Sequence, residues 1–165
     1  MFEEKVVCFS HSAGLLSLVG VPIVVGQADF PGIHVAARNL AADFARVTKG
    51  PPSPLQIVTN EHDEFASDSD SAIIVGSIVA NPIIQRLEKN GKIHLGSIRG
   101  KWESYTTTVV NNPFTGCRRA LVIAGSDKRG AIFGVYALSE QIGVSPYGIL
   151  CASNKYIFHC RLTVK

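Results

Sequence analysis

The side chains best suited to recognition chemistry lie in one short segment between two glycines. Residues 125–130 read Gly-Ser-Asp-Lys-Arg-Gly and follow an apolar run. Lys128 or Arg129 could bind a carboxylate, because a guanidinium donates two parallel hydrogen bonds to that group. In the alternative interpretation, Ser126 or Asp127 caps the helix that follows, and Arg129 joins this domain to a neighbouring one. The frequency of such caps at helix N-termini favours this structural alternative.

The same segment does not complete a nucleotide site. A Gly-x-x-x-x-Gly loop after a strand is half of a phosphate-binding loop, but Ala131 and Ile132 stand where a lysine and a hydroxyl residue are required. No Gly-x-Gly-x-x-Gly motif follows a predicted strand. A small nucleotide-binding domain is therefore the weakest interpretation, and we expect no cofactor.

A second pair, Trp102 and Glu103, has the residue types of a sugar site. The indole of Trp102 could stack on a sugar face. Glycoside hydrolysis requires two carboxylates, and Glu103 is a candidate for one of them. A tryptophan packed at a domain junction is the favoured alternative, because tryptophan is mostly buried. The acidic segment 61–70 has no apolar neighbours that would raise a carboxyl pKa, so it is expected to be a solvated loop. We assign no catalytic residue to this chain.

The four cysteines form no Cys-x-x-Cys unit; they are Cys8, Cys117, Cys151 and Cys160. Cys151 with His159 and Cys160 could form a metal cluster, but unrelated thiols are the favoured interpretation at such spacing. We therefore expect no metal. A disulfide between Cys8 and Cys117 is left open for an exported protein.

Hydrophobic periodicity predicts the elements that must position these residues. Ile33, Ala37, Leu40, Phe44 and Val47 form one apolar stripe of a helix. This helix spans Pro31–Thr48, with Asp29 as a plausible N-cap; the other helices run from Asn81-Pro82 to about Lys89 and from the glycine segment to Gly143. The predicted strands are an edge hairpin at Lys5–Phe9 and Leu15–Val19, then Pro22–Gly26, Leu55–Thr59, Ala72–Gly76, Lys101–Val110 and Arg119–Ala124, with a turn at Asn111–Gly116. The order β-α-β-β-α-β-β-α predicts a single layered α/β domain, a mixed β-sheet with helices packed on it.

Composition limits the classes of partner. The chain has 165 residues, 46% of them hydrophobic, which suffices for one domain with its own core. Charged residues make up 18%, against roughly a quarter in typical soluble domains, consistent with a surface partly covered by another body. The net charge of +3 is spread without a basic block, so no nucleic-acid partner is expected. The apolar segment Leu15–Val25 is too short for a membrane span and no signal peptide is evident, so no membrane association is expected.

Several motifs in order resemble the N-terminal accessory domain of glycoside hydrolase family 115, the xylan α-1,2-glucuronidases. They cover roughly Cys8 to Pro146 and comprise Asp29–Gly32, Ala41–Phe44, Ala72–Ser77, Gly100–Ser104, Val110–Pro113, Ala120–Gly130, Gly134–Tyr136 and Leu138–Pro146. The resemblance implies a secreted, extracellular hydrolase that removes glucuronic or 4-O-methylglucuronic acid from xylan by inversion. Its partners would be its own catalytic barrel or a xylan-type polysaccharide.

In that family a (β/α)8 barrel supplies the catalytic carboxylates after this point. Residues 147–165 do not match the family, so we expect an accessory domain at 1–146 that is truncated before the barrel and inactive alone. The tail is then the start of a missing barrel or an aberrant C-terminus; a short strand at Lys155–Val164 pairing with a sheet edge is the other possibility. A free-standing α/β module that binds carbohydrate or protein without catalysis is the alternative function.

Overall fold

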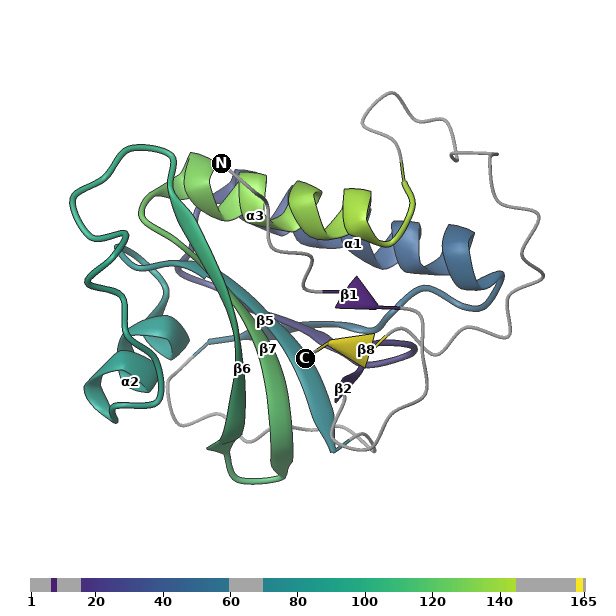
Figure 1. Ribbon diagram of the computed structural model, residues 1–165, viewed down its shortest axis with the longest axis horizontal. Coiled ribbons are helices and arrows are strands. Elements are labelled where there is room, and N and C mark those ends of the chain that lie inside the picture. The colour runs from purple at the N-terminus through teal and green to yellow at the C-terminus, as the bar shows by residue number, and fades with distance from the viewer. Residues whose placement is uncertain (1–6, 9–15, 60–69, 145–162, 165) are drawn as a thin grey trace.

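The computed structural model is an α/β domain in which a five-stranded mixed sheet has three helices packed on it (Figure 1). It describes residues 7–8, 16–59, 70–144 and 163–164. The sheet contains β3 (Ile23–Gly26), β4 (Leu55–Val58), β5 (Ser71–Ser77), β6 (Tyr105–Phe114) and β7 (Cys117–Gly125); the helices are α1 (Pro31–Thr48), α2 (Pro82–Lys89) and α3 (Lys128–Gln141). The predicted fold class and element order are confirmed.

The strands lie in the order β4-β3-β5-β7-β6. The first four are parallel to one another, and β6 runs antiparallel to β7 at the edge. Strands β5 and β7 are central and buried along almost their whole length. Their continuous apolar runs follow from this position, because a central parallel strand is covered on both faces.

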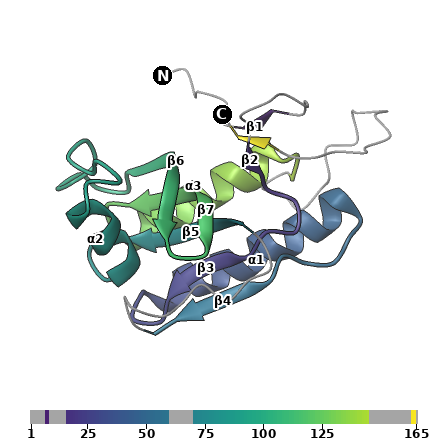
Figure 2. The ribbon, with the colours of Figure 1, turned by 90° about the horizontal axis from the view of Figure 1, so that it is seen from below.

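The two faces of the sheet are covered unequally. Helices α1 and α3 lie side by side on one face, where Ile33, Leu40 and Phe44 of α1 pack against Ile73 and Leu121 of the sheet (Figure 1). Among the described residues, the other face carries only the short helix α2 and the segment after it (Figure 2). The buried side chains on that side include Ile84, Leu87, Ile93 and Leu95. The face under α2 therefore has the thinner cover.

Two predicted boundaries are wrong. Asp29 does not cap α1: the N-cap is Phe30, with no side-chain cap bond, and the Asp29 carboxylate binds Ser77 at the end of β5 and Asn81 before α2 instead. The predicted turn at Asn111–Gly116 is largely strand, because β6 begins only at Tyr105 and continues to Phe114. A register shift between Asn111 and Phe114 absorbs the irregular residues of this stretch, so the pairing with β7 continues.

The predicted N-terminal hairpin is also wrong. Strands β1 (Val7–Cys8) and β2 (Leu16–Ser17) do not pair with each other. Both pair antiparallel with β8 (Thr163–Val164), which lies between them in a separate three-stranded sheet. Residues 61–69 of the predicted loop at 61–70, residues 147–162 of the predicted tail at 147–165, and the Cys151, His159 and Cys160 group lie outside the described residues.

The disulfide between Cys8 and Cys117 is not formed: Cys117 is a buried free thiol. Its sulfur donates to the Arg119 carbonyl oxygen at 3.3 Å, and burial raises the pKa of the thiol to about 11. None of the helices in the described part of the chain is long and apolar enough to cross a membrane.

Candidate functional site

Three parallel strands, β3, β5 and β7, end at the same edge of the sheet. At that edge α1 follows β3, α2 follows β5 and α3 follows β7. The helix after β3 and the helix after β7 lie on one face, whereas the helix after β5 lies on the other. In open α/β sheets, ligands bind in the crevice between two neighbouring strands whose following connections go to opposite faces of the sheet. The crevice between the ends of β3 and β5 is therefore the first place to look for a site.

That crevice is filled by the protein's own side chains. Asp29, which follows β3, is buried and accepts hydrogen bonds from the Ser77 backbone N–H at 2.9 Å and from the Ser77 hydroxyl at 2.8 Å. Its second oxygen also accepts from Asn81 Nδ2 at 2.9 Å. We call Asp29, Ser77 and Asn81 the edge network. Both oxygens of the Asp29 carboxylate accept hydrogen bonds, so Asp29 links the chain after β3 to the end of β5.

Asn81 completes the edge network from the start of α2. Its side-chain oxygen accepts from the backbone N–H groups of Ile83 and Ile84, at 3.0 and 3.2 Å, which confirms the predicted cap. Its amide also donates to the Val75 carbonyl at 3.2 Å. This amide lies against Gly76, where an added Cβ would stand 2.1 Å from Asn81 Nδ2. Glycine is required at position 76 because the crevice has no remaining volume.

The glycine segment after β7 is tied to the chain just before β6. The Ser126 N–H donates to the Ser104 carbonyl at 2.8 Å, and the Ser126 hydroxyl accepts from the Ser104 N–H at 3.0 Å. Asp127 accepts from the N–H of Glu103 at 2.9 Å and from that of Gly130 at 2.7 Å. Asp127 is thus the N-cap of α3, as the structural alternative expected.

Both glycines of this segment are required by close packing. A Cβ on Gly125 would stand 2.0 Å from the Ala131 backbone nitrogen, and one on Gly130 would stand 2.2 Å from the Ser104 carbonyl oxygen. The first turn of α3 therefore lies directly on the chain before β6. Hydrogen bonds from Glu103 and Gly130 lower the pKa of Asp127, which is the opposite of what a general acid requires.

The outer layer of this end is more exposed. Arg129 pairs with Glu103 at 2.9 Å, and its guanidinium carbon lies 5.7 Å from the centre of the Phe133 ring. Trp102 is 87% exposed, and Lys128 is exposed as well. The fold thus brings all six predicted site residues to one end of the molecule. Their contact with a substrate or with another domain stays a prediction.

The described side chains at this end offer little catalytic chemistry. The Asp127 carboxylate is held by backbone N–H groups, and that of Glu103 by Arg129. No group of three or more histidine, cysteine, aspartate or glutamate residues within the described part of the chain could hold a metal ion. The arrangement suits recognition or packing rather than bond cleavage.

The sequence did not indicate a second feature, a hollow of about 230 Å³ on the α2 face. It is lined by Lys92, Ile93, His94, Leu95, Thr106, Thr107, Thr108, Val122 and Ala124. The alternating threonines of β6 were the only signal, and that pattern alone predicts a strand. We call this feature the threonine hollow.

No protein-family model and no curated protein matches the chain. Its fold is similar to part of a solved family GH115 4-O-methyl-α-glucuronidase, BtGH115A, described as specific for decorated arabinogalactans: TM-score 0.57, 24% identity, 81% of this chain and 15% of that one. It is also similar to part of CpGH84D, with TM-score 0.53, 12% identity, 96% of this chain and 22% of that one. The chain thus spans a small fraction of both proteins. It resembles in fold a small domain of glycoside hydrolases.

Proposed function

We propose that this chain is the accessory α/β domain of a secreted glycoside hydrolase resembling the xylan α-1,2-glucuronidases, and that it does not hydrolyse substrate by itself. The observation that carries this proposal is the disproportion in coverage: 81% of this chain matches only 15% of a family GH115 enzyme. A domain of that share leaves most of the larger protein to supply the reaction centre.

The chemistry of the strand edge supports an accessory role. An inverting glycosidase needs one carboxylic acid with a raised pKa and one carboxylate that activates water. The Asp29 carboxylate already accepts hydrogen bonds from Ser77 and Asn81, and the pKa of Asp127 is lowered rather than raised. The required pair would come from another part of the enzyme.

The exposed end around Trp102 supports docking to a catalytic barrel of the same polypeptide. Near Trp102, which precedes β6, helix α3 also has exposed aromatic residues. These are Phe133 and Tyr136, with exposed fractions of 41% and 45%. Tyr136 accepts a hydrogen bond from Asn39 of α1 at 3.1 Å, so this surface extends across both helices. Aromatic side chains held in place on rigid helices are typical of interface cores.

Incubating the purified chain with glucuronoxylan, and measuring released uronic acid, tests the absence of catalysis. We expect no release above that of the heat-denatured chain. Sequencing the full transcript across the Pro146 codon tests the parent enzyme, with a continuing frame that encodes a barrel as the expected result. Release of glucuronic or 4-O-methylglucuronic acid by the chain alone would contradict the proposal.

A second candidate function is a carbohydrate-binding module without catalysis. The exposed indole of Trp102 favours it, because a sugar face stacks on such a ring. Trp102 is the single tryptophan of the chain, so its intrinsic fluorescence reports this site directly. A saturable change of that fluorescence on titration with xylo-oligosaccharides, absent with manno-oligosaccharides, would favour this function over domain docking.

A further inference from the structure

In the described part of the chain, the threonine hollow lies where the cover of the sheet is short on one side. Helix α2 has eight residues, and with the segment that follows it covers the centre of the sheet. Edge strand β6 extends beyond this cover. Thr106 and Thr108 pair with Ala124 and Val122 in the antiparallel register, so all four side chains share the α2 face. The hollow is the gap between that face and the segment after α2.

The lining combines three kinds of surface. Val122, Ala124, Ile93 and Leu95 provide apolar walls. The hydroxyls of Thr106 and Thr108 can each donate and accept a hydrogen bond, and His94 adds a further polar group. Lys92 adds a cation at the same opening.

These polar groups are unused within the described chain. Among the described residues, no hydrogen bond or ion pair involves the side chains of Lys92, His94, Thr106 or Thr108. This contrasts with the edge network, where every polar group has a partner. Partly buried hydroxyls that lack a protein partner are available to a ligand.

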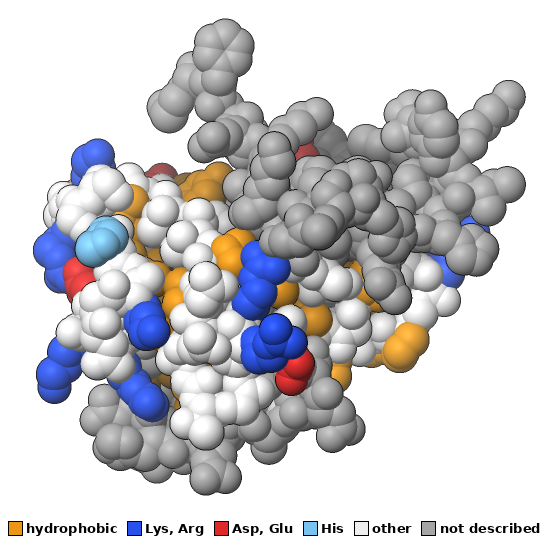
Figure 3. All heavy atoms as spheres, turned by 60° about the horizontal axis from the view of Figure 1, so that its bottom comes forward, with side chains coloured by type: hydrophobic (Ala, Val, Ile, Leu, Met, Phe, Trp, Pro, Cys, Tyr) orange, Lys and Arg blue, Asp and Glu red, His pale blue; other side chains and the backbone are white. Residues whose placement is uncertain are grey.

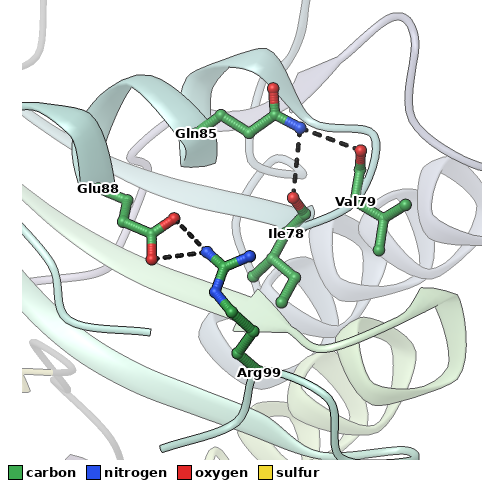
Figure 4. Close-up of polar contacts among 5 residues, drawn as sticks. All are labelled: Ile78, Val79, Gln85, Glu88 and Arg99. Carbon is green, nitrogen blue, oxygen red and sulfur yellow. Dashed lines mark hydrogen bonds and ion pairs between the residues drawn. The ribbon is translucent and has the colours of Figure 1, made fainter. Parts of the chain in front are cut away.

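The wall of the hollow is fixed before any ligand binds. Arg99 donates to the Glu88 carboxylate at 2.7 Å, and Gln85 donates to the Ile78 and Val79 carbonyls at 3.2 and 3.0 Å (Figure 4). The Arg99–Glu88 contact joins the segment after α2 to the helix itself. The hydrogen bonds of Gln85 join α2 to the chain after β5. Buried Ile93 and Leu95 hold the segment on the sheet. A wall held in this way loses little conformational entropy on binding.

The surroundings are basic. Between Arg86 and Lys101 the chain carries five lysines and arginines and one acidic residue, Glu88. Glu88 is neutralised by Arg99. Lys and Arg side chains predominate over acidic ones at the left of Figure 3, with a histidine among them. Such a surface attracts anions.

We propose that the threonine hollow binds a small anionic polyol: a single hydroxylated ring that carries a carboxylate, phosphate or sulfate. The ring would lie against Val122 and Ala124, the threonine hydroxyls would bind its hydroxyl groups, and Lys92 would face the anion. The hollow, at about 230 Å³, is below the range of roughly 300–1,000 Å³ for drug-sized ligands, so one sugar unit suits it better than a chain of several.

The test is a titration of the complete ¹⁵N-labelled chain, followed by amide chemical shifts. The probes are glucuronate, glucose 6-phosphate and galactose 6-sulfate, with glucose and inorganic phosphate as controls. We expect saturable shifts at residues 92–95 and 106–108 with at least one sugar anion, in the millimolar range typical of such small ligands. Binding of glucose should be about tenfold weaker, because it has no charge to offer Lys92.

Two variants locate the site. Thr108→Val should weaken binding about three- to tenfold through loss of a hydroxyl, and Lys92→Gln about tenfold through loss of the charge. Thr115→Val, in the turn after β6, and Lys49→Gln, at the end of α1, are the matched controls and should bind as the unaltered chain does. The amide spectrum of each variant verifies its fold.

The proposal is overturned if no sugar anion gives saturable shifts at the hollow, or if the two site variants bind as the controls do. Glucose binding as well as the anions overturns the role of charge, and inorganic phosphate binding as well overturns the role of the ring. Whether carboxylate, phosphate or sulfate binds best names the source of the anion. The proposal is independent of the accessory-domain role, which the uronic acid assay and the transcript test separately.

Discussion

The edge network and the threonine hollow are two polar regions that differ in whether their hydrogen-bonding groups have partners in the described part of the chain. In the edge network, Asp29 is enclosed and all its donors come from the protein. In the hollow, Thr106 and Thr108 have no partner in the described chain. The position where α/β folds usually bind ligands is thus closed by packing, and the open polar surface lies on the thinly covered face.

This difference separates polar residues that stabilise the fold from polar residues that are available for binding. A satisfied buried group makes removal of any one member costly, because its former partners are left unpaired. An unsatisfied group at an open hollow costs the fold little when it is removed. Substitutions in the two regions should therefore separate clearly on a stability scale.

The largest effect is expected for Asp29→Ala. This substitution leaves the Ser77 N–H, the Ser77 hydroxyl and the Asn81 amide without their acceptor in a buried site. We expect the free energy of unfolding to fall by about 3–5 kcal/mol, measured by urea denaturation with far-ultraviolet circular dichroism. Asp70→Ala is the matched control, because Asp70 is exposed and its ion pair with Arg118 spans 3.6 Å. Equal unfolding midpoints for the two variants would show that the edge network does not stabilise the fold.

A second way to break the edge network is to fill the space that it needs. In Gly76→Ala the new methyl group would stand 2.1 Å from Asn81 Nδ2, so the amide must leave its position between Asp29 and Val75. We expect a loss of about 2–3 kcal/mol by the same denaturation measurement. Gly96→Ala, where no atom lies within 4 Å of the added Cβ, is the control and should change stability by less than about 1 kcal/mol. A loss at position 96 as large as that at 76 would contradict the packing explanation.

A smaller effect with a defined pH dependence is expected at Asp127, in the tie between α3 and the chain before β6. Asp127→Ala removes the acceptor of the Glu103 and Gly130 N–H groups and should cost about 1–2 kcal/mol at pH 7. The pKa of Asp127 is lowered in the folded state from its ordinary value of 3.8. Its contribution is therefore fully present above that ordinary value and is lost as the pH falls through the lower folded pKa.

The measurement for Asp127 is the difference in unfolding free energy between the unaltered chain and the variant, from pH 7 down to pH 2. Asp127→Asn is the control, because asparagine is as good an N-cap but carries no charge. It should remain close to the unaltered chain at pH 7, with a difference that shrinks in acid. A cost of Asp127→Ala that stays constant down to pH 2 would exclude the charged carboxylate as the source of the stability.

The sequence predicted the regular elements well, because their signals are local. The apolar stripe from Ile33 to Val47 gives α1 its observed bounds, and Asn81 caps α2 as its position before Pro82 suggested. The central strands follow from uninterrupted apolar runs. Each of these features depends on residues within a few positions of one another.

Apart from the turn predicted at Asn111–Gly116, the errors concern partners that are distant in sequence. Asp29 has the position of a helix cap, but its acceptors are used by Ser77 and Asn81, which lie 48 and 52 residues away. Strand β1 was expected to pair with β2, whereas both pair with β8 near the other end of the chain. The threonine hollow likewise needs a turn after α2 to meet β6. A periodicity in one segment carries no information on which remote segment will cover it.

The smallest expected effect sharpens the comparison most directly, because it removes a hydroxyl group from each region. Thr108→Val keeps the shape of a side chain whose hydroxyl has no partner, and valine suits a strand, so stability should change by less than about 0.5 kcal/mol. Ser77→Ala removes a buried hydroxyl that donates to Asp29 at 2.8 Å and should cost about 1–3 kcal/mol. Both variants would be compared in one set of urea denaturation curves. If Thr108→Val cost as much as Ser77→Ala, the hydroxyl at position 108 would be a structural group, and the hollow would have no unused hydroxyl there to offer a ligand.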